Sequence, residues 1–153
     1  MKIWNLVILG LFACGEETRD CNFSVWFDSE AVIEPGEQAI SRIRYATGCR
    51  IDQLRTGTHI SSVAHLEDAE GPLCGATDLG KNTTVISEDC PDLDNIIAHE
   101  LFHVMIQESD NSVHSETGVF KLSTGNLIDE STLSLVCSYV DCPTLNPETK
   151  PQE

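Results

Sequence analysis

Seven cysteines are spaced along this chain of 153 residues, and six of them fall between residues 21 and 142. An even number of cysteines in a short chain is typical of exported proteins, in which they pair as disulfides. No pair has the Cys-x-x-Cys spacing of a structural zinc site, so a cysteine zinc site is the weaker alternative. We therefore predict three disulfides, with the pairing left open, among Cys21, Cys49, Cys74, Cys90, Cys137 and Cys142.

The start of the chain has the composition of an export signal. One basic residue precedes a short apolar run that ends at Ala13, and the run is shorter than the roughly 20 apolar residues that cross a bilayer. Residues 11–14, Leu-Phe-Ala-Cys, resemble the bacterial lipoprotein box, which implies cleavage before Cys14 and lipid attachment to its thiol. We expect residues 1–13 to be a lipoprotein signal peptide and residues 14–20 a polar tether.

The expected location follows from this segment. The protein is predicted to be exported and lipid-anchored to a bacterial membrane, at the outer membrane or the cell surface. An ordinary secretory leader is the alternative, and it predicts a periplasmic or secreted protein.

The composition fits one globular domain with an acidic surface. Hydrophobic residues make up 41% of the chain, and 9 basic against 25 acidic residues give a net charge of −16. Nucleic acid is an unsuitable partner, because phosphate binding needs clustered lysine and arginine. We expect a monomer whose single domain spans residues 21–142, followed by a flexible tail at residues 143–153.

The hydrophobic pattern predicts an α+β domain, with helices packed on one mixed, twisted sheet. Alternating and β-branched segments predict strands at residues 21–27, 51–54, 59–66, 75–78 and 83–87, with a loop at 68–72. Helical periodicity predicts an N-terminal helix, a central helix and a C-terminal helix at residues 35–47, 92–106 and 129–139.

Local signals support these helices. Pro35 suits a first turn, and Gly48 is placed to end the first helix in the left-handed conformation. Residues 89–92 are predicted to cap the second helix. The residues predicted to face the core from the first and third helices are Ile33, Ala39, Ile40, Ile43, Ala46, Ile128, Leu133, Val136, Tyr139 and Val140.

The second predicted helix carries the motif His99-Glu100-Leu101-Phe102-His103. Side chains four residues apart lie on one helix face, so the two imidazoles can bind the same zinc ion. Glu100 lies beside that face, where its carboxylate can take a proton from a zinc-activated water molecule. The motif therefore predicts His99 and His103 as ligands and Glu100 as the catalytic general base. An ordinary amphipathic helix with two surface histidines is the alternative.

A catalytic zinc ion usually has three protein ligands, and the sequence offers several candidates for the third. His114 lies in the polar segment after the helix, and Glu130 lies at the start of the third predicted helix. An acidic residue at that position also suits a helix N-terminus. We predict His114 as the third ligand, with Glu130 as the runner-up. The remaining candidates are Glu108, Asp110 and Glu116.

These motifs together resemble the metzincin clan of zinc metalloproteases, and within it small bacterial lipoproteins of the matrixin type. The segments that carry the resemblance are Tyr45–Gly48, Gly75-Ala76, Thr83–Ser87, His99–His103, His114-Ser115, Thr117–Phe120 and Ile128–Glu130. The resemblance implies a small zincin-like fold and one catalytic zinc ion, bound by His99, His103 and His114. It also implies peptide-bond hydrolysis with Glu100 as general base and acid.

Three features depart from the family pattern. In H-E-x-x-H-x-x-G-x-x-H five residues separate the second and third histidines, whereas ten residues lie between His103 and His114 here. Ile106 stands at the position of the family glycine. The methionine of the turn beneath the metal is also missing, and Val119 or Phe120 takes its place as the hydrophobic floor.

The predicted function is that of a zinc-dependent metalloendopeptidase tethered at the bacterial cell envelope. Its partners are a protein or peptide substrate and the membrane, and an extended substrate is expected to pair with the sheet edge at residues 75–77. The alternative is a catalytically degenerate lipoprotein that keeps a protease-like fold and binds zinc or a partner.

Other ionisable residues are weaker candidates. His59 and His65 flank an apolar strand and are expected to be surface or packed histidines rather than ligands. Asp68, Glu70 and Asp78 could bind calcium, as loops in this family often do, but they lack the spacing of an EF-hand, and a solvated loop is expected.

Overall fold

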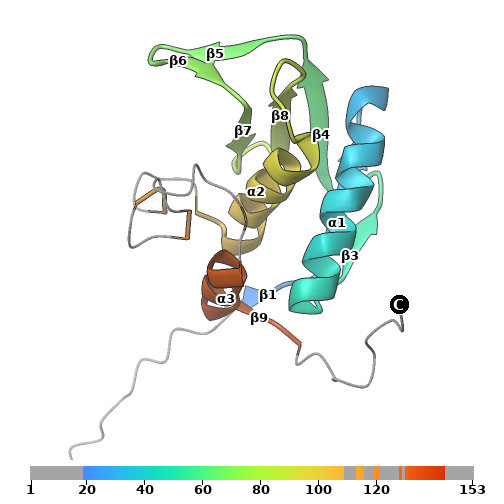
Figure 1. The fold of residues 1–153 in the computed structure, drawn as a ribbon. Helices are drawn as coiled ribbons and strands as arrows, with labels where there is room; N and C mark the ends of the chain where they lie inside the picture. Colours follow the sequence, from blue (N-terminus) through green and yellow to red (C-terminus); the bar gives the residue numbers. More distant parts are fainter. Residues whose placement is uncertain (1–18, 109–112, 116–118, 121–127, 129, 144–153) are drawn as a thin grey trace, which may run out of the picture.

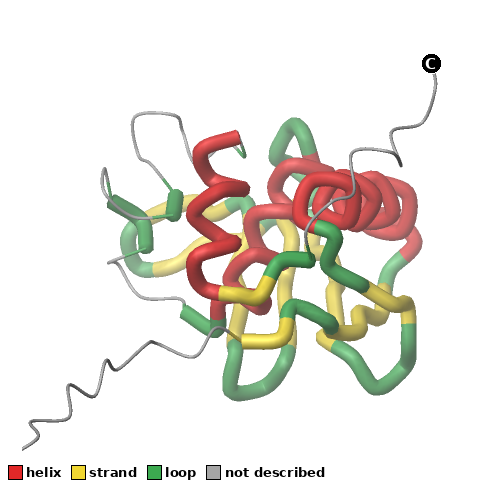
Figure 2. The backbone as a smooth tube through the Cα atoms, turned by 90° about the horizontal axis from the view of Figure 1, so that it is seen from below, coloured by secondary structure: helices red, strands yellow, loops and turns green. Residues whose placement is uncertain are grey.

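The chain forms an α+β domain, as its sequence predicts. The computed structural model describes residues 19–108, 113–115, 119–120, 128 and 130–143. In this part, three α-helices pack with a twisted five-stranded sheet, and two short two-stranded sheets complete the fold. Helices α1 (Ile33–Thr47) and α2 (Leu93–Ile106) lie alongside each other on one face of the sheet, and α3 (Glu130–Tyr139) packs against both (Figure 1). Figure 2 shows this layering from below.

The large sheet has the strand order β3-β2-β4-β8-β7. Strands β3, β2, β4 and β8 are parallel, whereas β7 runs antiparallel to β8 at one edge. The outer side of β7 has no neighbouring strand among the described residues. The strand predicted to reach residue 66 ends at Val63. The bounds are β2 (Phe23–Phe27), β3 (Ile51–Gln53), β4 (Thr58–Val63), β7 (Gly75–Asp78) and β8 (Thr83–Ser87).

A hairpin occupies the segment that the sequence predicts as a loop. Strands β5 (Leu66–Asp68) and β6 (Gly71–Leu73) pair antiparallel. The Asp68 side chain accepts hydrogen bonds from the N–H groups of Glu70 and Gly71 at 2.7 and 3.0 Å. Gly71 has a φ of 137°, which favours glycine. The predicted turn is thus present, but the strands beside it are too short to give a periodic signal.

Helix α1 begins earlier than its sequence pattern predicts. A short 3-10 turn, η1 (Glu30–Val32), leads directly into the helix at Ile33, so Pro35 lies inside the first turn. Ile33 is 41% exposed, and its predicted place in the apolar stripe is wrong because this first residue precedes the packed turns. Gly48 ends the helix with a φ of 72°, as predicted. The predicted core residue Ala46 is half-buried, and the buried residues of α1 are Gly36, Ala39, Ile40, Ile43 and Thr47.

Helix α2 lies at the centre of the fold. It starts after Asp92, whose backbone is left-handed (φ 57°) and whose side chain makes no capping hydrogen bond. The carbonyl oxygen of Asp92 instead accepts hydrogen bonds from the N–H groups of Asn95 and Ile96 at 3.0 and 3.1 Å. The predicted boundary is therefore correct, but the cap is made by the backbone. The buried apolar residues of α2 are Ile97, Ala98, Leu101, Phe102, Val104, Met105 and Ile106.

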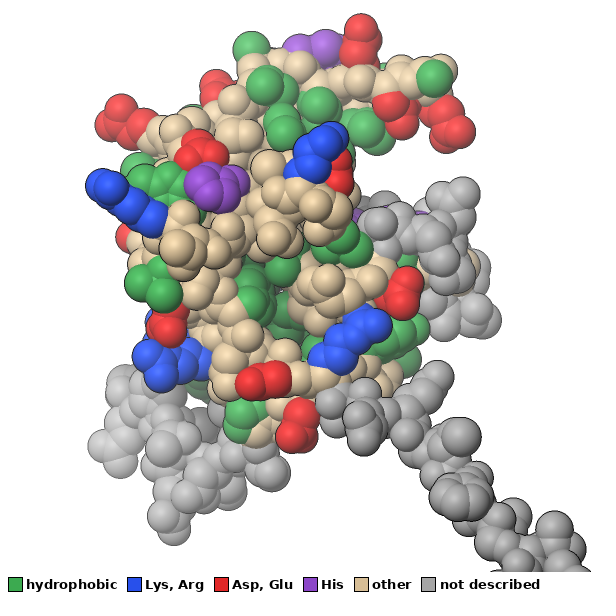
Figure 3. Space-filling view, turned by 180° about the vertical axis from the view of Figure 1, so that it is seen from behind, with side chains coloured by type: hydrophobic (Ala, Val, Ile, Leu, Met, Phe, Trp, Pro, Cys, Tyr) green, Lys and Arg blue, Asp and Glu red, His purple; other side chains and the backbone are tan. Residues whose placement is uncertain are grey.

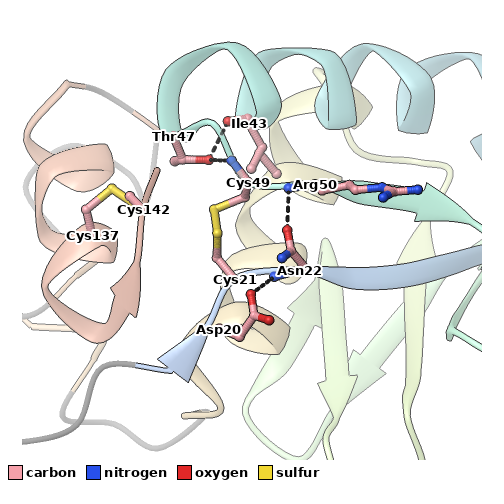
Figure 4. Close-up of a disulfide and its surroundings, with 9 residues drawn as sticks. All are labelled: Asp20, Cys21, Asn22, Ile43, Thr47, Cys49, Arg50, Cys137 and Cys142. Carbon is pink, nitrogen blue, oxygen red and sulfur yellow. Dashed lines mark hydrogen bonds between the residues drawn. A yellow bond between two sulfur atoms is a disulfide. The ribbon is translucent and has the colours of Figure 1, made fainter. Parts of the chain in front are cut away.

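Three disulfides link the six cysteines beyond residue 20, as the sequence predicts. The first links the residue pair just before β2 to the turn after α1, and the third links the last part of α3 to the residue after β9 (Figure 4). Disulfides persist in oxidising compartments, so these bonds indicate an exported protein. The pairs are Cys21–Cys49, Cys74–Cys90 and Cys137–Cys142, with Cα atoms 5.4, 5.6 and 5.3 Å apart.

The two ends of the domain lie side by side. Strand β1 (Arg19–Asp20) pairs in parallel with β9 (Val140–Asp141), so the last two residues of the predicted tether pair with a strand of the domain. Val136 and Val140 are buried as predicted, and the side chain of Leu133 lies outside the described part. Tyr139 is 39% exposed. Its predicted core position is wrong, because the helix ends there and the chain continues as β9.

The surface carries charged side chains of both signs. On the face seen from behind, acidic and basic side chains are dispersed rather than gathered (Figure 3). A pocket of about 310 Å³ lies among β1, β2, the start of β4 and the end of α2, and no predicted metal ligand lines it. Within the described residues, no helix has both the length and the apolar character needed to cross a membrane.

Candidate metal centre

Three histidines meet between α2 and the segment that follows it. His99 and His103 lie one helical turn apart on α2, and their Nε2 atoms are 3.2 Å apart. His114 brings its own Nε2 to 3.2 Å from each of these atoms. The structure thus brings together the three residues that the sequence predicts as ligands. Among the described residues, this is the one group of three or more histidine, cysteine or acidic side chains placed to hold a metal ion.

The size of the nitrogen triangle fits a metal ion. Nitrogen ligands about 2.0–2.1 Å from a tetrahedral ion lie about 3.3 Å from one another, and the observed separations are 3.2 Å. The three contacts cannot all be hydrogen bonds, because a neutral imidazole carries one N–H group, and that of His103 faces a backbone carbonyl. The residues present therefore fit one ion bound by three imidazoles.

The orientation of His103 directs a lone pair into the triangle. Its Nδ1 donates a hydrogen bond to the carbonyl oxygen of Glu108 at 2.7 Å, so the proton of the neutral ring is on Nδ1 and not on Nε2. Burial lowers the pKa of His103 to about 4, the Glu108 carbonyl opposes this shift, and the nearby His114 adds to it. The ring is therefore neutral at pH 7, as a metal ligand must be.

A phenylalanine ring lies against all three imidazoles. Phe120 is fully buried, and its ring centroid is 3.8 Å from that of His99, 4.7 Å from His103 and 5.2 Å from His114. The backbones of His114 and Phe120 form an isolated parallel bridge. Of the two residues predicted as the hydrophobic floor, Phe120 is the one stacked on the histidines, and Val119 is buried in the core cluster.

The carboxylate of Glu100 faces the edge strand β7. Its Oε2 accepts a hydrogen bond from the Thr77 hydroxyl at 2.7 Å, and a Cβ atom at Gly75 would lie 2.6 Å from its Oε1. Glu100 is 5% exposed. Burial raises the pKa of Glu100 to about 7, and the Thr77 hydrogen bond opposes this rise. A carboxyl group with such a pKa can take up and release a proton near neutral pH.

The other candidates for the third ligand fall into two groups. Glu108 contributes its backbone carbonyl oxygen to His103, and its carboxylate is not part of the cluster. The side chains of Glu130, Asp110 and Glu116 lie outside the described part of the chain, although Glu130 is the first residue of α3. His114 is thus the candidate that the structure places at the site.

The two remaining histidines lie at the surface, which is one of the two positions predicted for them. Nδ1 of His59 is 3.0 Å from Oδ2 of Asp28, and Nδ1 of His65 is 3.1 Å from Oδ2 of Asp89. Their side chains are 41% and 54% exposed. Neither ring belongs to the metal-binding group.

The three acids considered for calcium do not converge. Asp78 forms an ion pair with Lys81 at 2.7 Å, whereas Asp68 holds the turn between β5 and β6. Glu70 is exposed on the same turn. In the part of the chain that is described, these residues form no metal-binding group.

Two neighbours of Glu100 carry no signal in the sequence that would identify them. Thr77 and Gly75 lie two positions apart and so face the same side of β7. Their alternation predicts an edge strand, but the helix residue that they meet depends on how α2 crosses the sheet.

Sequence comparison with protein families and curated proteins finds no relative of this chain. No protein-family model matches it, and no curated protein matches it in sequence. Cys14, the predicted lipidation site, lies outside the described residues. The function is therefore inferred from the metal centre and its surroundings.

Proposed function

We propose that this chain is a zinc-dependent metalloendopeptidase of the metzincin type. The observation that carries the proposal is the triangle of Nε2 atoms, two from α2 and one from His114, at the spacing of one tetrahedral ion. Structural zinc sites are closed by four protein ligands, whereas catalytic sites use three and keep one position open. Three histidines together with the glutamate of the same helical motif are the donor set that a catalytic site uses.

The surroundings of the triangle support the same proposal. The motif that supplies His99 and His103 also supplies Glu100, which is close enough to β7 to bond Thr77. The sheet has an antiparallel edge strand beside α2, and Phe120 provides an apolar floor. These features agree with the zincin-like fold that the sequence resemblance implies.

The chemistry divides between the ion and the protein. Zinc held by the three histidines would activate water and polarise the scissile carbonyl. Glu100 takes the proton of the attacking water and later gives it to the leaving amine. The Glu108 carbonyl fixes the tautomer of His103, and the Phe120 ring excludes water from the side of the imidazoles that it covers.

The proposed substrate is an extended segment of protein or peptide. The outer side of β7 carries no strand among the described residues, so an extended chain can add there through main-chain hydrogen bonds. Thr77 of β7 contacts Glu100, so a chain on this edge lies next to the general base. Main-chain pairing alone requires no particular side chain, which favours a broad substrate range.

The proposed location is the outside of a bacterial cell membrane, with a lipid anchor at Cys14. The three disulfides support export, and the sequence of residues 11–14 supports the anchor. Mass spectrometry of the mature N-terminus tests this part directly. A diacylglyceryl mass on Cys14 is expected, and a free thiol at that position contradicts the anchor.

The decisive test compares the wild-type protein with Glu100→Gln. We expect both proteins to hold one zinc ion per chain by elemental analysis. Only the wild type should cleave unfolded casein, because the amide cannot take the proton of water. Full activity in the variant, or no bound zinc in the wild type, contradicts the proposal.

A second candidate is a zinc-binding envelope protein without turnover. The observation that favours it is the burial of Glu100, which is 5% exposed and bonded to Thr77. In that case the wild type retains zinc but cleaves no unfolded protein, and Glu100→Gln changes neither result.

A further inference from the structure

Two threonine hydroxyls and the Glu100 carboxylate form a continuous chain of hydrogen bonds. Thr77 on β7 and Thr84 on β8 are partners in the antiparallel register, and their Oγ1 atoms are 2.9 Å apart. The Thr77 hydroxyl also lies 2.7 Å from Oε2 of Glu100. Thr84 is fully buried, so this chain runs from the interior of the sheet to the helix.

The direction of the hydrogen bonds follows from the donors available. An ionised carboxylate only accepts, and a threonine hydroxyl has one proton to donate. When Glu100 is ionised, as a general base must be, Thr77 therefore donates to Glu100 and Thr84 donates to Thr77. Threonine is stiff at χ1 because it is branched at Cβ, so the Thr77 hydroxyl holds Oε2 in one place.

Gly75 leaves the space that the other carboxylate oxygen occupies. A Cβ atom at this position would lie 2.6 Å from Oε1 of Glu100 and 2.9 Å from its Cδ and Cγ atoms. The φ of Gly75 is not positive, so the backbone does not require glycine here. The absence of a side chain instead makes room for Glu100.

A disulfide fixes the strand relative to the helix. Cys74 directly precedes Gly75, and it is bonded to Cys90, which lies just before the Asp92 cap of α2. The N–H of Ser87 also donates to the Cys74 carbonyl at 2.9 Å. The start of β7 is thus held both to β8 and to the segment that leads into α2.

We propose that Thr77 is a positioning residue for Glu100, acting with Gly75 and supported by Thr84. This inference rests on the proposed peptidase function. The Thr77 hydroxyl holds Oε2 against β7, which leaves Oε1 to receive the proton of the attacking water. Among the described residues, the side-chain hydrogen bond to this carboxylate comes from Thr77 and goes to Oε2 rather than to Oε1.

The test compares Thr77→Val with Thr77→Ser in the full, exported protein. Valine keeps the shape and removes the hydroxyl, whereas serine keeps the hydroxyl. We expect Thr77→Val to lower kcat on fluorogenic casein by about 10–100-fold, the usual cost of misplacing a catalytic group. KM and the zinc content should stay at the wild-type level, because neither the β7 backbone nor a ligand is changed. Thr77→Ser should recover most of the activity.

A second variant approaches the same carboxylate from the other side. Gly75→Ala adds a methyl group where Oε1 lies, so it should also lower kcat while zinc stays bound. Thr84→Val removes only the donor behind Thr77, and a smaller fall in kcat is expected. Circular dichroism of each variant checks that the fold is retained.

The outcomes separate this inference from the proposed function. A wild type that holds zinc but cleaves nothing overturns the proposed function, and the positioning role with it. An active wild type beside a fully active Thr77→Val overturns the positioning role alone. Equal losses in Thr77→Val and Thr77→Ser also overturn it, because the hydroxyl would then not be the group that matters.

Discussion

The ring of Phe120 lies 3.8 Å from the ring of His99, centroid to centroid, and is tilted by 30°. The same ring contacts His103 and His114. One fully buried side chain therefore packs on all three histidines of the candidate metal centre. Packing of this kind orients ligands before the metal binds.

Phe120→Leu should therefore weaken zinc binding as well as the fold. The smaller side chain leaves a gap beneath the imidazoles, so we expect the dissociation constant for zinc to rise by about 10-fold or more. The free energy of unfolding should fall by about 1–2 kcal/mol. Zinc titration and urea denaturation measure the two effects. Phe102→Leu is the matched control, since Phe102 is equally buried on α2 and should lose stability but not zinc affinity.

His114→Ala should remove one of three ligands. We expect zinc affinity to fall by more than about 100-fold, because losing a ligand should cost more than losing a residue that only supports a ligand. Elemental analysis after dialysis against a competing chelator gives the result, and His59→Ala is the control because His59 lies at the surface with Asp28. If His114→Ala retains zinc, the third ligand is instead an acid such as Glu130.

The stability of the metal-free domain should depend on pH through Glu100. Burial raises its pKa from 4.5 to about 7, so the folded state holds this proton more tightly than the unfolded state. The free energy of unfolding therefore falls as the pH rises from about 4.5 to about 7. Glu100→Gln lacks this titration. The free energy of unfolding of the variant minus that of the wild type should therefore be about 2–3 kcal/mol larger at pH 8 than at pH 4.

Urea denaturation of both proteins in the presence of a chelator provides this measurement. His103 has the opposite effect, because burial lowers its pKa in the folded state from 6.5 to about 4. Its contribution to the free energy of unfolding therefore rises as the pH rises from about 4 to about 6.5. Both proteins carry His103, so its effect cancels in the difference. A difference that stays constant with pH contradicts the prediction.

The three disulfides should contribute unequally to stability. They close chain segments with sequence separations of 28, 16 and 5 residues, and the loop-entropy model assigns them about 4, 3 and 2 kcal/mol. Paired Cys→Ser substitutions, followed by urea denaturation, test this order. The Cys74–Cys90 pair has a further expected effect, since its loss should lower peptidase activity by loosening β7 beside Glu100. The Cys137–Cys142 pair is the control for activity.

The cluster of three histidines could be predicted because its geometry is mostly local. The helix period alone places His99 and His103 on one face, and His114 lies close enough in sequence for the chain to return. The end of α1 at Gly48 could be predicted for the same reason, because a glycine that ends a helix is a local signal. The disulfide count also follows from the sequence, whereas the partners of Cys21 and Cys74 depend on tertiary structure.

The support of Glu100 could not be predicted for the opposite reason. Thr77 and Glu100 are 23 residues apart, and their contact depends on the register of β7 on β8 and on the path of α2 across the sheet. Periodicity also misplaced Ile33 and Tyr139 in the core. It records which face of a helix is apolar, but it does not record where the helix leaves the packed layer.

The disulfides also determine how the domain would carry a mechanical load. A pull on its two ends is applied at β1 and just beyond β9, which pair in parallel, and the Cys137–Cys142 bond carries the force past residues 138–141, which include β9. Beyond that pair, the Cys21–Cys49 bond carries the force past residues 22–48, and the Cys74–Cys90 bond carries it past residues 75–89. Strands β2, β7 and β8 cannot be drawn out while these bonds remain. The β7–β8 pair beside Glu100 therefore lies outside the path of the force while the Cys74–Cys90 bond remains.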